Sequence, residues 1–119
     1  MQLIKSFGYA WKGITHCFFM EMNFKIHVVI AFITILCSVY FGLSPKEWVV
    51  IIICIAAVLA LEMLNTAVEN ICNKFCPDID PQVKIIKDVA AGAVLIAAIA
   101  SACIGVLIFL PKLLIALNK

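Results

Sequence analysis

The sequence contains no arginine, and only 13% of its 119 residues are charged. About a quarter of the residues of a soluble domain are charged, so this chain has too little polar surface to cover a globule in water. It also has no block of like charge and no basic cluster, and its net charge is only +2. These absences disfavour a nucleic-acid-binding protein. The length allows one domain, residues 1–119, and leaves no room for a conventional nucleotide-binding fold beside a membrane part.

The six cysteines form no recognisable framework. Cys72 and Cys76 lie one helical turn apart, but no histidine or second cysteine pair joins them, so we expect no zinc site. Free cysteines in apolar runs behave as small hydrophobic residues, and we expect them to pack. A cleavable signal peptide is not evident either, because Lys5, Lys12 and Glu21 interrupt the apolar residues at the start of the chain.

Long apolar runs are abundant, and 66% of the residues are hydrophobic, with a mean hydropathy of +1.17. The three longest runs are Val28–Leu43, Trp48–Leu61 and Val89–Leu110. A membrane span needs about 20 apolar residues, and the first two runs reach that length with their flanks. We therefore predict an all-α integral membrane protein with spans at about 26–43, 47–73 and 86–110. Ser44-Pro45 separates the first two spans, and Pro111 ends the third.

The first 25 residues have a different pattern, typical of an amphipathic helix at the membrane surface. Apolar side chains recur at helical spacing on one face: Leu3, Ile4, Phe7, Trp11, Ile14, Phe18 and Met22. The opposite face carries Lys5, Tyr9, Lys12 and His16. Such a helix lies in the interface with its apolar side toward the lipid, and we predict it over about residues 2–22.

The distribution of lysines predicts the orientation. Six of the nine lie in the N-terminal segment or around the second loop, and three lie on the opposite side. Because positive residues favour the cytoplasm, we expect the N-terminus and the Pro77–Pro81 loop to be cytoplasmic.

Ionisable residues inside a membrane helix are costly and indicate function. Glu62, Asn65 and Glu69 are spaced i, i+3 and i+7, so they share one helix face. Counted from Trp48, Glu62 lies ~21 Å and Glu69 ~32 Å along the helix, which puts this stripe across the cytoplasmic interface. Glu21 and the pair Lys87-Asp88 are expected at the same depth.

Structural roles are open for most of these residues. Asp88 could cap the third span or pair with Lys84, and Glu21 could pair with Lys25. Asn65 could bridge two helices by hydrogen bonding, and Glu69 could be solvated. A structural role explains Glu62 least well, because a buried carboxylate is expensive.

The cluster suits phosphoryl transfer. Carboxylate and amide oxygens bind a hard cation such as Mg²⁺ together with phosphates, and lysine supplies a charge for the phosphates. Glu62, a separate and partly buried carboxylate, suits a general base. We expect no other carboxylate or histidine at its depth, and we expect His27 to face a neighbouring helix. Since no Walker A loop or protein-kinase signature is present, an ATP site here must be built from helix ends.

Three motifs carry a resemblance that covers nearly the whole chain. They are Lys5-Ser-Phe-Gly-Tyr9-Ala-Trp11-Lys12-Gly13, Glu62-Met-Leu-Asn65-Thr-Ala-Val-Glu69 and Lys87-Asp88-Val-Ala-Ala-Gly92. In this order, together with Glu21, they resemble the prokaryotic diacylglycerol kinase family, small three-span membrane enzymes that include undecaprenol kinases.

The resemblance implies a homotrimeric bundle with active sites shared between subunits, in the bacterial inner membrane. It implies that Glu62 is the catalytic base on the lipid hydroxyl and that Glu21 and Glu69 bind Mg²⁺ beneath ATP. Trp11 and Glu62 would contact the lipid. The ATP-binding set that it implies is Lys5, Tyr9, Glu21, Asn65, Glu69, Asp78, Asp80, Lys87 and Asp88.

Two departures from the family pattern bear on the acceptor. Asn73 stands where an Asp is common, and Gln2 stands where diacylglycerol-specific members have an Arg. The run Asn23-Phe24-Lys25-Ile26-His27 looks more like the undecaprenol kinase branch, so both acceptors remain open.

The expected function is ATP-dependent phosphorylation of diacylglycerol or undecaprenol, in phospholipid or lipid-carrier recycling. The alternative is a small proton-coupled transporter that uses Glu62. A transporter distributes polar groups through the bilayer depth, whereas here they crowd one edge.

Overall fold

The protein consists of four helices and no strands, and the computed structural model describes all 119 residues. The helices are α1 (Gln2–Met20), α2 (Met22–Phe41), α3 (Pro45–Phe75) and α4 (Pro81–Leu117). The last three are long and apolar enough to cross a membrane. The all-helical fold with three candidate spans is thus confirmed.

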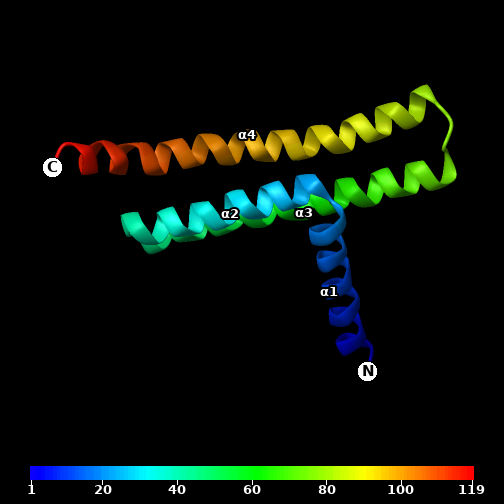
Figure 1. The fold of residues 1–119 in the computed structure, drawn as a ribbon, viewed down its shortest axis with the longest axis horizontal. Helices are drawn as coiled ribbons and strands as arrows, with labels where there is room; N and C mark the ends of the chain where they lie inside the picture. The colour runs from blue at the N-terminus through cyan, green and yellow to red at the C-terminus, as the bar shows by residue number, and fades with distance from the viewer.

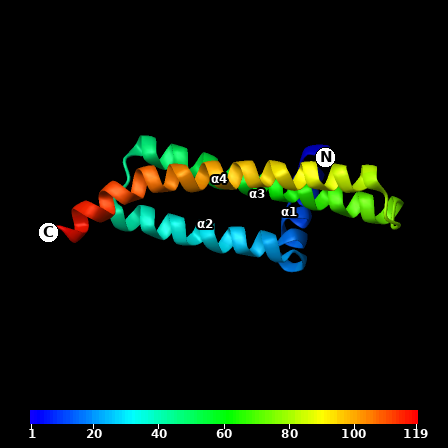
Figure 2. The ribbon, with the colours of Figure 1, turned by 90° about the horizontal axis from the view of Figure 1, so that it is seen from above.

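The three long helices lie side by side, and α1 leaves them sideways. Helices α3 and α4 run antiparallel along the whole molecule, and α2 packs against α3 (Figures 1 and 2). Helix α1 contacts α2 and α3 only where it joins them, closer to the α3–α4 loop than to the α2–α3 turn (Figure 1). It therefore runs across the direction of the bundle, as a helix in the membrane plane would.

Local sequence signals explain the helix ends near the α2–α3 turn. Gly42 ends α2 with a left-handed backbone at φ 65°, a conformation that glycine adopts without steric cost. Ser44 begins α3 with a capping box: its hydroxyl accepts from the Glu47 N–H, and the Glu47 carboxylate accepts from the Ser44 N–H. Glu47 also pairs with Lys112 of α4 at 3.1 Å, so one residue secures the start of α3 twice.

Helix α4 is longer than the sequence predicts. It starts at Pro81 rather than near 86, because the Asp80 carboxylate caps it by accepting from the Gln82 and Val83 N–H groups. Asp88 is therefore not the cap. Nor does Pro111 end the helix, which continues to Leu117. A proline inside a helix removes one hydrogen bond and bends the axis, and Figure 2 shows the last turns of α4 bending away from the rest.

Few side chains are buried within one chain. Eleven of the 119 residues are, and four of these are polar: Ser38, Glu62, Asn65 and Thr66. Large apolar side chains are exposed along all three long helices, which suits surfaces that face lipid or other membrane helices. The three buried polar groups within five residues of α3 form the centre of a candidate site.

Candidate active site

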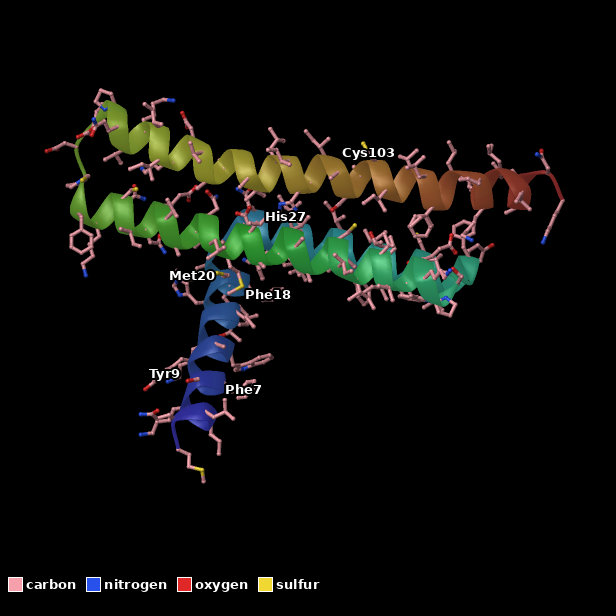
Figure 3. The ribbon with its side chains drawn as sticks, turned by 180° about the vertical axis from the view of Figure 1, so that it is seen from behind. Phe7, Tyr9, Phe18, Met20, His27 and Cys103 are labelled. Carbon is pink, nitrogen blue, oxygen red and sulfur yellow. The ribbon has the colours of Figure 1, made fainter.

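Glu62 is the centre of the site. Its side chain, on α3, is only 5% exposed, and its Oε2 lies 3.9 Å from Nε2 of His27 on α2. Figure 3 shows His27 where α2 crosses α3. The expectation that His27 faces a neighbouring helix is confirmed, but the expectation that no histidine lies at the depth of Glu62 is wrong. Residue spacing along one helix could not reveal this contact, because it depends on how α2 packs on α3.

One turn further along α3, Asn65 and Glu69 form a second part of the site. The Asn65 amide Nδ2 donates to Glu69 Oε1 at 3.2 Å, and Asn65 Oδ1 is buried with no hydrogen-bond partner. Asn65 therefore bridges no helices within the chain. A buried acceptor left without a partner is costly, and here it lies beside a carboxylate. An oxygen-only arrangement of this kind fits a hard cation or its bound water.

Glu21 lies at the corner between α1 and α2. Its extended backbone interrupts the helix, and its N–H donates to the Cys17 carbonyl at 3.0 Å. No ion pair joins Glu21 to Lys25. Burial raises the pKa of the neighbouring Cys17 thiol, and the carboxylates of Glu21 and Glu62 raise it further. The corner thus brings Glu21 and Cys17 to the same region as Glu62.

Lys87 and Asp88 lie on the first turns of α4, and the Lys87 side chain faces the end of α3. Lys87 Nζ donates to Asn73 Oδ1 across the two helices, and no carboxylate lies within ion-pair distance of Lys87. Its charge is therefore held in place by a neutral amide and stays free for an anion. Asp88 pairs with Lys84 at 2.6 Å, which confirms the i,i+4 pair that the sequence left open.

The α3–α4 loop forms one side of an open cavity of about 280 Å³. Asp78 and Asp80 line it together with Lys84, Lys87 and Asn73. Asp80 is also the cap of α4, so a structural role accounts for at least one of its oxygens. The polar lining leads from the loop to Lys87 and suits a charged ligand.

Three of the expected contact residues do not reach the cluster of their own chain. Lys5, Tyr9 and Trp11 are exposed on α1, and Tyr9 is 68% exposed. Figure 3 shows Tyr9 and Phe7 near the free end of α1, far from His27. Within one chain, no hydrogen bond or ion pair joins these residues to Glu69 or Lys87.

No three histidine, cysteine, aspartate or glutamate side chains gather in the chain to hold a metal ion. An ion at Glu21 and Glu69 would therefore need its remaining ligands from water or phosphate. This is how Mg²⁺ is usually bound in phosphoryl-transfer sites, by one or two carboxylates and the substrate's phosphates.

Comparison with known proteins identifies the family of this chain. The profile of the prokaryotic diacylglycerol kinase family matches residues 8–109. The chain belongs to this family. It is 40% identical to an undecaprenol kinase of Bacillus subtilis, over 94% of this chain and 91% of the relative. It is 37% identical to a diacylglycerol kinase of Synechocystis, over 94% and 65%, and 26% identical to the diacylglycerol kinase of Escherichia coli K12, over 82% and 80%.

Family membership makes this multi-pass membrane protein a lipid kinase, with ATP as phosphoryl donor. The transporter alternative is not supported. Buried polar groups where α3 packs on α2, together with an unpaired lysine at the start of α4, agree with a kinase whose soluble and lipid substrates meet at a membrane interface. Sequence reasoning did not place His27 beside Glu62; its only signal was a histidine inside an apolar span.

Proposed function

We propose that this kinase transfers the γ-phosphoryl group of ATP to the hydroxyl of a membrane lipid alcohol, with Glu62 as the general base. One observation carries the proposal: a carboxylate buried to 5% exposure at the contact of two spanning helices, with an unpaired buried oxygen on the next turn. Such burial is expensive for a structural residue. It suits a group that accepts a proton away from bulk water.

The proposed chemistry is a direct transfer. The lipid oxygen attacks the γ-phosphorus, the bond to the β-γ bridging oxygen breaks, ADP leaves, and the hydroxyl proton passes to Glu62. His27, 3.9 Å from the carboxylate, faces the same group and limits how it can turn. General-base assistance is worth ~10²–10⁴-fold in rate.

Glu21 and Glu69 are proposed to hold Mg²⁺ with the nucleotide's phosphates. The fit rests on the donor set: half-buried carboxylates from two elements, with the unpartnered Asn65 Oδ1 next to Glu69. Bound there, the ion would neutralise phosphate charge. Lys87, held by Asn73, and Asp88 are proposed to face the phosphates, and Asp78 and Asp80 the base or ribose in the loop cavity.

We further propose a homotrimer with shared sites. Helix α1, amphipathic by its sequence, projects away from its own cluster (Figure 1), so Lys5, Tyr9 and Trp11 would reach the nucleotide and lipid of a neighbouring subunit. Mixing two inactive variants, Tyr9→Ala and Glu62→Gln, tests this. Partial recovery of activity supports shared sites, because a mixed trimer would contain one intact site; no recovery in confirmed mixed trimers contradicts them.

The protein is proposed to lie in the bacterial inner membrane with its N-terminus in the cytoplasm. This orientation brings Lys87 and the loop cavity to cytoplasmic ATP. Cysteines introduced at Gln2 and Asn118 should react with impermeant reagents from opposite sides of the membrane. Labelling of both from one side would contradict three spans.

The proposed acceptors are undecaprenol and diacylglycerol. We place undecaprenol first because the undecaprenol kinase of Bacillus subtilis matches this chain over nearly the full length of both proteins. The test is transfer of labelled phosphate from Mg-ATP to each lipid by purified protein in mixed micelles. Labelled undecaprenyl phosphate is expected. If only phosphatidic acid is labelled, the acceptor is diacylglycerol and not undecaprenol. If neither lipid is labelled, the proposed function is contradicted.

A further inference from the structure

A largely apolar cavity of about 300 Å³ lies between α2, α3 and α4, inside the candidate spans. Ten of its 14 lining residues are hydrophobic. Its volume falls at the low end of the range for ligand-binding pockets, ~300–1,000 Å³. Apolar cavities do not retain water, so a hydrocarbon occupant is the chemistry that this lining favours.

The cavity begins at the catalytic region. His27 lines it, and the same His27 ring lies 3.9 Å from the Glu62 carboxylate. From there the lining follows α3 from Leu59 to Ile51, a rise of ~12 Å along the helix. The cavity therefore extends away from Glu62 into the membrane half that lies toward the α2–α3 turn.

A second cavity continues the same path. It lies between α2 and α4 and measures about 580 Å³. The two cavities share four lining residues: Thr34, Ala102, Gly105 and Phe109. Together they form an apolar route from His27 toward the far end of the bundle, and Gly105 is one of the four residues that line both cavities.

We propose that these joined cavities bind the hydrocarbon chain of the acceptor lipid, with its hydroxyl against Glu62. This inference rests on the proposed function and names the part of the protein that selects the acceptor lipid. The continuity with the base through His27 is what favours a substrate chain over a bystander lipid. A long chain would fill both cavities, and a short chain would end in the first.

Gly105 offers a clean test of this route. A Cβ placed there would meet no atom within 4 Å, so alanine fits at this position without moving the backbone. Gly105→Leu would narrow the passage between the cavities, and Gly105→Ala is the milder step. Ala100→Leu is the matched control, because Ala100 is exposed on the same helix and lines neither cavity.

The experiment compares kcat/KM for a long and a short acceptor in each variant, using undecaprenol with geraniol and dioleoylglycerol with dioctanoylglycerol. Gly105→Leu should lower kcat/KM for the long acceptor at least ~10-fold, the scale of a one- to two-methylene clash in an apolar pocket. The value for the short acceptor should change little. Ala100→Leu should leave the ratio of long to short as in the wild type.

Every other outcome decides against one of the two proposals. A wild-type protein that phosphorylates no acceptor overturns the proposed function. An active Gly105→Leu protein with an unchanged ratio overturns the chain-binding cavity alone. Gly105→Leu could instead lower kcat/KM equally for both acceptors and change the oligomeric state in gel filtration. In that case a second copy of the protein fills the cavity, and the proposal that it binds the lipid hydrocarbon is again overturned.

Discussion

The two halves of the helical bundle are built in opposite ways. In the half toward the α3–α4 loop, which we call the loop half, the buried residues of α3 are mainly polar: Glu62, Asn65 and Thr66, with Cys72. In the half toward the α2–α3 turn, the turn half, the buried residues of α3 are Ile51 and Val58. There the charged residues Glu47 and Lys112 pair with each other near the helix end.

This difference supports the proposal that the loop half carries the chemistry. The turn half satisfies its polar groups locally, through the capping box of Ser44 and the Glu47–Lys112 pair. The loop half leaves Asn65 Oδ1 unpartnered, Glu62 beside His27, and Lys87 without a carboxylate. We propose that a bound ligand supplies the partners that these groups lack in the free protein.

The largest expected effect comes from removing both carboxylates that are proposed to bind Mg²⁺. The double variant Glu21→Gln/Glu69→Gln should lose Mg²⁺-dependent nucleotide binding, measured as ATP affinity with and without Mg²⁺. The loss of transition-state charge stabilisation, worth several kcal/mol, should lower turnover by more than ~10²-fold. Glu47→Gln in the turn half is the control. If the double variant still binds Mg-ATP like wild type, the metal assignment is wrong.

A smaller effect is expected at His27. The His27→Leu variant keeps an apolar wall but removes the ring nitrogen that faces Glu62, and kcat should fall about tenfold, or ~1.4 kcal/mol of barrier. KM for ATP should not change, because His27 lies on the lipid side of the site. Partial recovery of kcat in His27→Gln, with no effect of His16→Leu, would show that His27 acts by positioning Glu62 and not by packing alone. A changed KM for ATP with constant kcat would contradict this role.

Asp80 separates capping from nucleotide contact. Asp80→Ala should lower the free energy of unfolding by about 1 kcal/mol, the usual value of an N-cap, as measured by denaturation in micelles. Asp80→Asn should retain that stability, because asparagine caps equally well. Weaker ATP binding in a stable Asp80→Asn protein would assign the carboxylate to the nucleotide. Equal affinity would leave it as a cap alone.

The mildest prediction concerns Cys17, which lies in the loop half and whose thiol pKa is raised mainly by burial. A raised pKa leaves less thiolate at neutral pH, and thiolate is the reactive form. Cys17 should therefore react with maleimide more slowly than the exposed Cys76, and its rate should rise only at higher pH. Glu21→Gln should speed the reaction. Equal reaction rates at Cys17 and Cys76 would contradict the prediction and show that the Cys17 thiol, at the corner between α1 and α2, is accessible to solvent.

The sequence predicts the helices and the stripe on α3 well, because both follow from local periodicity. The apolar runs identify α2, α3 and α4, and the i, i+3, i+7 spacing groups Glu62 with Asn65 and Glu69. Helix ends were less accurate at α4: capping by Asp80 starts it early, and α4 passes through Pro111, which a local breaker rule cannot foresee.

Contacts between helices are what the sequence could not supply. The approach of His27 to Glu62 and of Lys87 to Asn73 depends on how each pair of helices is rotated. The cavity at Gly105 likewise results from the packing of three helices. The projection of α1 separates Lys5 and Tyr9 from the cluster, and no periodicity along α1 indicates this.

The central claim is that Glu62 accepts the proton of the lipid hydroxyl. The Glu62→Gln variant tests it most directly, because the amide keeps the shape of the side chain and most of its hydrogen bonding but cannot act as a base. Single-turnover transfer of labelled phosphate from bound Mg-ATP to the lipid should slow by ~10²-fold or more, while Mg-ATP binding and oligomeric state stay as in the wild type. A transfer rate within a few-fold of wild type would contradict the claim and leave Glu62 as a packing residue.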